Sequence, residues 1–436
     1  MMSLSVSRRT FLGGSVLGAT IAPAVPAETA PPDLAQYGFP KDVRDRIEAG
    51  RATILKELQP TRAQLERGLQ LHYDSYVADL MGCVWTSAPI GARGQRLQKE
   101  LDQLQQKLSN HKKSEREIAH QVRRRWRRLK TFESAFDPEW KRIARGLYQL
   151  TGLDLVVEDN AGHYTLNQSL RFMAGSQLVY SNWNDAIRIS RASDLIRAQR
   201  QKKLGVVSQL QGVHHLWVPE QSLDNLDLFY GLGIRIAQLT HRHSTALGST
   251  CEHLDDGGLT LEGREAIHRM NELGVIVDLA HASRRTSLEA IESSNEPVIN
   301  SHTACEQIYD DADNRNIDDE YLRLLADKGG LVGVYVWPRR LSEQVYPNFD
   351  DWYRHLEHAV RVAGIDHVGI GTDVTYLPNY TPHPMDWTNW PYWTVGLVCR
   401  GFSDGDIRKI LGSNFLRFAE KVMDKAPWGA FGGSRA

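Results

Sequence analysis

The sequence has no hydrophobic run long enough to cross a membrane. Its 436 residues contain no stretch of about 20 consecutive apolar residues, the length that a transmembrane helix requires. It also has no excess of charge, because 52 Lys and Arg stand against 53 Asp and Glu and give a formal net charge of −1. We therefore expect neither a membrane span nor a nucleic-acid partner.

Cysteine is scarce as well. The four cysteines, Cys83, Cys251, Cys305 and Cys399, are widely spaced, which excludes a zinc knuckle of the CxxC type. They could be reduced or paired in three ways, and the sequence does not choose between these states. The 41% apolar and 24% charged residues are typical of a soluble globular protein. The length suits one barrel-sized domain with additions or two ordinary domains.

The first 27 residues have the order of a twin-arginine export signal. The pair Arg8-Arg9 precedes a Gly/Ala-rich apolar run that ends near Ala22, and Val25-Pro26-Ala27 supplies a small-residue cleavage site. A disordered terminus with a chance arginine pair is the less favoured alternative. We expect a periplasmic or secreted protein that is carried by the twin-arginine export machinery.

Residues 28–70 are predicted to be a linker followed by an N-terminal helix, from the helical spacing of Ile47, Ile54 and Leu58. The next residues, 69–74, alternate in polarity and are predicted to form a strand. On a strand, His72 and Asp74 would face the same side and could bind one ion together.

Residues 92–147 differ in composition from the rest of the chain. The stretch Gln95–Lys130 contains no Gly or Pro, and Leu97, Leu101, Leu104 and Leu108 recur at 4-3-4 spacing. This pattern predicts a long charged helical insertion, a helical hairpin beside the main body. Its basic cluster at 123–128 could contact an anionic partner, but a solvated helix face is the favoured interpretation.

Short apolar runs that end in metal-ligand or proton-transfer residues recur from about residue 204. Strands alternating with helices at this pitch predict an α/β fold, a TIM-type (β/α)8 barrel over residues 71–425, followed by a tail over 426–436. The carboxyl ends of barrel strands meet at one mouth, so their terminal side chains should converge. The runs are Gly205–Gln211, Ile234–His241, Val275–His281, Pro297–His302 and His367–Asp373.

Imidazole and carboxylate ligands of this mix suit Zn²⁺, with Co²⁺, Mn²⁺ or Fe²⁺ as substitutes. Such an ion activates water and polarises a carbonyl group, which is the chemistry of amide hydrolysis. A barrel mouth with incidental histidines is the alternative interpretation, and several such residues at successive strand ends make it the weaker one.

Six motifs, in order, resemble the renal (membrane) dipeptidase family of zinc peptidases, a branch of the amidohydrolase-like barrels. The resemblance runs from about His72 to Arg417 and is interrupted by the helical insertion. The motifs are Leu239–His241, Val277–Ser283, Pro297–His302, Arg315–Asp319, Gly369–Asp373 and Gly412–Arg417.

The resemblance implies a metal site. By position, His72 and Asp74 match the first-strand His-x-Asp ligands, and His281 and His302 match the pair that holds the second zinc ion. Asp373 matches the last-strand aspartate that binds metal and handles the proton.

The resemblance also implies a substrate site. His241 matches the histidine that stabilises the oxyanion or positions the substrate. Arg315, followed by Asn316, matches the arginine that receives the substrate carboxylate, which a guanidinium can bind bidentately.

One position departs from the pattern. Where the family has a glutamate that bridges two zinc ions, this chain has Gln211. An amide oxygen can bind one ion but lacks the charge that holds two cations close together. We thus predict one or two zinc ions, the second less favoured, in a metal-dependent dipeptidase-like hydrolase of a dipeptide or small amide.

Two alternatives stay open. A single-metal tailoring enzyme of the isomerase or lyase type could act on a peptide-derived metabolite in the same pocket. A degenerate, non-catalytic barrel could instead use its insertion to bind a partner. A homodimer is compatible with any of these.

Overall fold

The structure is a computed structural model. It describes residues 34–83, 91–110, 114, 117–118, 121–122, 125, 135–159, 165–213, 222–253, 255–344, 347–375 and 387–423. The predicted export signal over 1–27 and the tail over 426–436 lie outside these residues. None of the described helices combines the length and the apolar character that a membrane crossing needs.

Two helices precede the barrel. Helix α1 (Lys41–Leu58) ends where Gln59 takes a left-handed conformation. Thr61 then begins α2 (Arg62–Tyr73) with a capping box, in which the Thr61 and Gln64 side chains each accept the other residue's backbone N–H.

The strand predicted over residues 69–74 is wrong, because α2 continues through it. The helical hydrogen-bonding pattern runs as far as the N–H of Asp74, which donates to Gln70 O. The alternating polarity of the segment reflects a helix that buries Leu69, Leu71 and His72. His72 and Asp74 are consequently not on the first strand.

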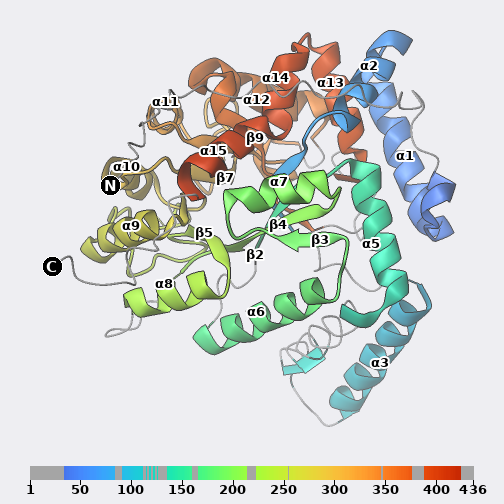
Figure 1. Cartoon of the computed structure of the whole chain (residues 1–436), viewed down its shortest axis with the longest axis horizontal. Helices are drawn as coiled ribbons and strands as arrows, with labels where there is room; N and C mark the ends of the chain where they lie inside the picture. The colour runs from blue at the N-terminus through green and yellow to red at the C-terminus, as the bar shows by residue number, and fades with distance from the viewer. Residues whose placement is uncertain are drawn as a thin grey trace, which may run out of the picture.

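The predicted barrel is confirmed. Within the described residues, eight parallel strands form a nearly closed TIM-type barrel in the order β1-β2-β4-β5-β6-β7-β8-β9 (Figure 1). Strand β10, just after β9, pairs with β1 and so joins the two ends, whereas β3 lies off this path and pairs with β4. The strands are β1 (Ala78–Cys83), β2 (Leu155–Asp159), β3 (Ala186–Arg188), β4 (Leu204–Leu210), β5 (Ile234–Gln238), β6 (Ile276–Asp278), β7 (Ile299–Thr303), β8 (Leu331–Val334), β9 (Val368–Ile370) and β10 (Val374–Thr375).

Helices surround the barrel (Figure 1). They include one after each of β5, β6 and β7, and the terminal pair α14 and α15. In chain order they are α5 (Pro138–Thr151), α6 (Leu166–Ser181), α7 (Ala192–Arg200), α8 (Ser222–Gly231), α9 (Leu261–Leu273), α10 (Arg284–Ser293), α11 (Asp319–Asp327), α12 (Phe349–Ala363), α13 (Trp390–Cys399), α14 (Asp404–Arg408) and α15 (Asn414–Met423).

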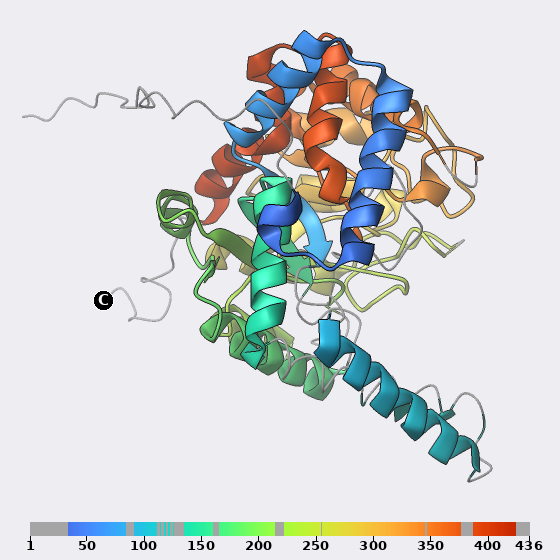
Figure 2. The ribbon, with the colours of Figure 1, turned by 90° about the vertical axis from the view of Figure 1, so that its right-hand side faces the viewer.

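The charged insertion contains one long described helix, α3 (Gly91–Asn110), which reaches away from the body in both views (Figures 1 and 2). Its predicted seam is buried at Leu101 and Leu108. By contrast, α5, most of which the sequence assigned to the insertion, packs its apolar face into the main core through Trp140 and Leu147. The projecting part therefore ends before α5.

The barrel interior is closely packed around strand β7. A Cβ atom added at Gly371 would lie 1.8 Å from the carbonyl oxygen of Ser301, and one added at Gly333 would lie 2.0 Å from it. Only glycine permits this approach of the β8 and β9 backbones to β7. Val207, Ile236 and Ile276 fill the neighbouring interior and are fully buried.

Candidate functional site

Five of the predicted site residues lie at the carboxyl ends of barrel strands, as expected. Gln211 follows β4, His241 follows β5, His281 follows β6, His302 lies on β7 and Asp373 follows β9. The parallel strands place these positions at one rim of the barrel.

His281 and His302 turn ring nitrogens toward each other at this rim. Their Nε2 atoms are 3.2 Å apart, and their ring centroids are 5.2 Å apart. Two nitrogen ligands of one tetrahedral zinc ion, each about 2.0–2.1 Å from the metal, have nitrogens about 3.3 Å apart. The two imidazoles are thus spaced to share one ion.

Burial and a nearby cation keep these rings neutral. Burial lowers the pKa of both His281 and His302 well below the usual range, and the Arg315 guanidinium lowers it further. Burial raises the pKa of the Asp373 carboxyl to about 6, while Arg315 and Arg340 oppose that shift. Neutral imidazoles are the form that binds metal ions, and a carboxyl with a pKa near neutrality can exchange protons.

Two of these residues have unusual backbones. His281 has a φ of 66° and Asp373 a φ of 55°, in the left-handed region that non-glycine residues seldom adopt. Such strain is found at sites where the surrounding structure holds a side chain in a required direction.

His241 lies beside the pair, with its ring centroid 4.3 Å from that of His281. The hydroxyl of Thr250 joins the two segments, because its oxygen lies 2.5 Å from His241 O and 3.0 Å from His281 O and its one hydrogen is shared between these carbonyls. Glu252 approaches His281 Nδ1 at 3.8 Å. Thr250 and Glu252 were not predicted from the sequence, because they lie in a loop without strand or motif signals.

Arg315 is buried behind His302. Its Nη2 atom donates to His302 O at 2.6 Å, and its guanidinium lies 5.8 Å from the Tyr335 ring centroid. Asp311 fixes the loop by accepting the backbone N–H groups of Arg315 and Asn316. The cation is therefore held against the rim.

Asn316 has a structural role, which corrects the predicted substrate contact. Its Nδ2 group donates to Tyr309 O and Arg340 O, and its Oδ1 atom accepts from the Tyr335 hydroxyl. These bonds use the hydrogen-bonding capacity of a buried amide within the protein.

His72 lies at the other end of the barrel. Its Nε2 atom is 2.7 Å from Thr151 O, just ahead of β2, and its Nδ1 atom is 2.8 Å from Thr394 Oγ1 on α13. Both ring nitrogens are thus occupied by protein groups. Asp74 follows α2, and its carbonyl oxygen accepts from Arg408. The prediction that these residues bind the metal is wrong, because the histidine lies on an outer helix and the aspartate follows the end of that helix.

Strand β1 presents different residues at the rim. In this strand Met81 and Cys83 are two positions apart, the spacing of the histidine and aspartate that the resemblance implies for the first strand. Met81 is buried, and its Sδ atom lies 3.3 Å from Gln211 Nε2. The apolar run after Tyr76 was the sequence signal for this strand.

These replacements decide which metal centre fits. A two-ion centre needs anionic ligands between and around the cations, and Met81 and Gln211 supply none. Among the described residues, no group of three or more His, Cys, Asp or Glu is arranged to hold a metal ion. The two-ion centre therefore does not fit this chain. One ion fits the donors of His281 and His302, and Gln211 and Asp373 follow other strands of the same rim.

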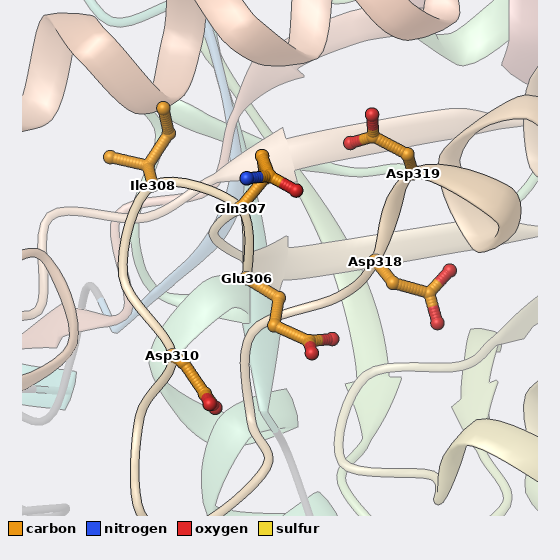
Figure 3. A pocket seen from close by; sticks show the side chains of 6 residues that line it. All are labelled: Glu306, Gln307, Ile308, Asp310, Asp318 and Asp319. Carbon is orange, nitrogen blue, oxygen red and sulfur yellow. The ribbon is translucent and has the colours of Figure 1, made fainter.

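A separate hollow of about 360 Å³ lies on the loop after β7 and the start of α11 (Figure 3). It is lined mainly by carboxylates, among them Glu306, Asp310 and Asp318. Arg284 forms ion pairs with Asp318 and Glu320 at its edge. The hollow contains none of the rim histidines, so it is distinct from the imidazole site.

Comparison with protein families gives a match over most of the chain. The profile of the family described as membrane dipeptidase (Peptidase family M19) matches residues 129–427, more than half of the chain. Strand β1, which carries Met81 and Cys83, precedes the matched segment.

Curated relatives are similar over part of their length. An uncharacterized dipeptidase of Schizosaccharomyces pombe is 32% identical over 258 residues, which cover 56% of this chain and 60% of that protein. The dipeptidase tcpJ of Claviceps purpurea is 26% identical over 272 residues, covering 62% and 63%. The chain thus spans less than two thirds of the length of either relative.

Among solved structures, an amidohydrolase from Pseudomonas aeruginosa has a TM-score of 0.63 at 24% identity and covers 82% of this chain and 99% of its own. A metallopeptidase from Rhodobacter sphaeroides, bound to a phosphinate mimic of the dipeptide L-Ala-D-Ala, has a TM-score of 0.56 at 17% identity. It covers 63% of this chain and 89% of its own. These likenesses show the barrel fold.

Proposed function

The chain belongs to the membrane dipeptidase family, a family of metal-dependent peptidases, and from that premise we propose that it hydrolyses a small dipeptide-like amide with a single zinc ion. The observation that carries this proposal is the 3.2 Å approach of the Nε2 atoms of His281 and His302. When bound, the ion would activate water and polarise the amide carbonyl.

The chain's own residues supply the remaining functions. Asp373 accepts and returns the proton, for which its raised pKa is suited. His241, beside His281, stabilises the developing oxyanion. Arg315 attracts the substrate carboxylate. The export signal stays a prediction, and with it a periplasmic or secreted location.

Metal analysis together with a dipeptide panel tests this proposal. The full chain, purified from cells grown with zinc, is expected to hold close to one zinc ion per protein and to release amino acids from at least one dipeptide. Replacement of His268, an exposed histidine on α9, by asparagine should change neither result. A folded protein that carries no zinc and cleaves no dipeptide would contradict the proposal.

The contact between Met81 and Gln211 favours a second candidate. An uncharged thioether in place of a histidine and an amide in place of a glutamate suit a tailoring reaction without net hydrolysis, such as an isomerisation or elimination. Reaction in H₂¹⁸O separates the two candidates, because hydrolysis places ¹⁸O in the product carboxylate and tailoring does not. Deuterium exchange at a substrate carbon in D₂O, without ¹⁸O uptake, would support tailoring.

A further inference from the structure

Behind the imidazole pair lies a chain of buried polar groups that the proposed reaction does not use directly. It consists of Asp278 on β6 and Ser301 and His302 on β7, and all three side chains are fully buried. Ser301 Oγ lies 2.6 Å from Asp278 Oδ2 and 2.8 Å from His302 Nδ1. The hydroxyl therefore connects the carboxylate to the ring.

Asp278 receives four donated hydrogen bonds. Its Oδ1 atom accepts from the backbone N–H groups of Ala280 and Ser301, both at 3.0 Å. Its Oδ2 atom accepts from Ser301 Oγ and from Gln209 Nε2, the latter at 2.5 Å. A group surrounded by four donors is stabilised as an acceptor, the role of an ionised carboxylate.

The direction of each bond in the chain follows from the count of hydrogens. A serine hydroxyl has one hydrogen, and Ser301 donates it to the Asp278 carboxylate. The Ser301 oxygen must then accept the hydrogen of His302 Nδ1. A neutral imidazole has only one N–H, so the Nε2 atom of His302 is left with its lone pair toward His281.

We propose that Asp278 and Ser301 are positioning residues that fix His302 in its Nδ1–H tautomer and so keep the Nε2 lone pair available at the rim. The functional value of that lone pair rests on the proposed function, because a metal ion or a proton donor is needed to use it. The tautomer itself can be measured without any activity.

Asp278→Asn should reverse the direction in which hydrogen bonds are donated along this chain of polar groups. The two backbone N–H groups on Oδ1 require the amide oxygen to stay there, which puts the amide NH₂ at the position of Oδ2. That NH₂ donates to Ser301 Oγ, and the hydroxyl then donates to His302 Nδ1. Gln209 must rotate its amide so that Oε1, which has no hydrogen-bond partner, accepts from the new NH₂, and this rotation breaks the bond from its Nε2 atom to Gln238 Oε1.

The test is long-range ¹H–¹⁵N NMR of the full chain, labelled at histidine and freed of metal with a chelator. The His302 signals are identified by their loss in His302→Gln. We expect the Nδ1–H form in the wild type, the Nε2–H form in Asp278→Asn and a mixture of the two in Ser301→Ala. Ser294→Ala is the matched control, since Ser294 is also buried and hydrogen-bonded but lies away from the histidines.

A metal readout accompanies the NMR experiment. Loss of an outer hydrogen-bonding partner commonly weakens metal binding by about 10- to 100-fold, so Ser301→Ala should lose zinc affinity within that range and Ser294→Ala should not. A wild-type His302 in the Nε2–H form, or an unchanged tautomer in folded Asp278→Asn or Ser301→Ala, would overturn the proposal. Absence of hydrolysis with the expected tautomers would contradict only the proposed function.

Discussion

The β6–β7 side and the β9–β1 side of the barrel rim share one pattern of hydrogen bonds to a buried aspartate, but they carry different functional side chains. On the first side, Asp278 accepts the N–H groups of Ala280 and Ser301 and the Ser301 hydroxyl. On the second, Asp79 accepts the N–H groups of Met81 and Thr372 and the Thr372 hydroxyl.

His302 follows Ser301 in the sequence, and Asp373 follows Thr372. On both sides, the hydrogen bonds to the aspartate thus position the residue next to a functional side chain. The two sides differ in the residue on the neighbouring strand. His281 meets His302 at 3.2 Å, whereas the β1 position is filled by Met81. The same hydrogen-bonding arrangement therefore lies beside a pair of histidines on one side of the rim and beside an uncharged thioether on the other.

Breaking the histidine side should have the largest effect. His302→Ala removes one of two facing nitrogens, and we expect zinc affinity to fall more than about 100-fold, beyond the usual loss from an altered outer partner. Met81→Leu, the matched change on the other side, conserves volume and should cost less than about 1.5 kcal/mol of stability. It should leave zinc affinity unchanged, because it alters neither His281 nor His302.

Calorimetric titration with zinc and thermal unfolding measure both variants. Equal losses of zinc affinity in His302→Ala and Met81→Leu would mean that the two sides of the rim do not differ as described.

Rebuilding the β1 side should have an intermediate effect. Combining Met81→His, Cys83→Asp and Gln211→Glu restores the ligand types of the family pattern, and we expect bound zinc to rise from about one to about two ions per protein, with faster dipeptide hydrolysis. Gln211→Glu alone should lower metal-free stability by about 1–3 kcal/mol, the cost of a poorly compensated buried polar or charged group.

Zinc should reverse that loss in Gln211→Glu. Gln238→Glu is the control, a buried glutamine on β5 whose destabilisation zinc should not reverse. Elemental analysis and unfolding with and without zinc measure these effects. A triple variant that is folded and still binds one ion would show that the β1 scaffold no longer supports a site.

The smallest effect is expected at the opposite end of the barrel. Burial raises the pKa of Asp154 from 3.8 to about 6, although its carboxylate accepts the Val77 N–H. The folded state therefore holds this proton more tightly than the unfolded state, and stability should fall as pH rises from about 4 to 6 and then level off. Asp154→Asn should remove that slope and stabilise the protein at pH 7 by about 1–2 kcal/mol.

Asp366 provides a control of opposite sign. Lys409 lowers the pKa of its carboxyl, so this group contributes stability above its unfolded pKa that is lost as pH falls. Asp366→Asn should lower stability at pH 7. Urea unfolding across pH 4–8 measures both variants, and a steeper slope in Asp154→Asn would contradict the assignment. Zinc affinity should be unchanged in both.

Much of the fold could be predicted from the sequence. The runs ending near Gln211, His241, His281, His302 and Asp373 are β-branched, bounded by helical segments and close to the observed strands, because buried parallel strands need continuous apolar residues. The first strand was misplaced. A His-x-Asp pair in α2 matched the family's letters, although the Thr61–Gln64 capping box indicated a helix and the apolar run at 76–81 lay just beyond it.

The site residues could be predicted only where they lie at the carboxyl end of a strand, because an apolar run marks such positions in the sequence. Thr250 and Glu252 reach the histidines through a loop whose path depends on tertiary contacts. Asn316 follows Arg315 in a family motif, but its amide is used within the protein. The carboxylate of Asp278 looks from sequence like any strand-end acid, and its role emerges only when β7 lies beside β6.

His281 and Asp373 have left-handed backbones, so selection for folding and selection for the reaction should favour different residues at these positions. A screen for folding alone should enrich glycine and asparagine there, since they adopt this conformation at the least cost. Only a screen for chemistry should return histidine and aspartate. Randomising the two codons would thus distinguish a barrel maintained for its reaction from one maintained for its shape.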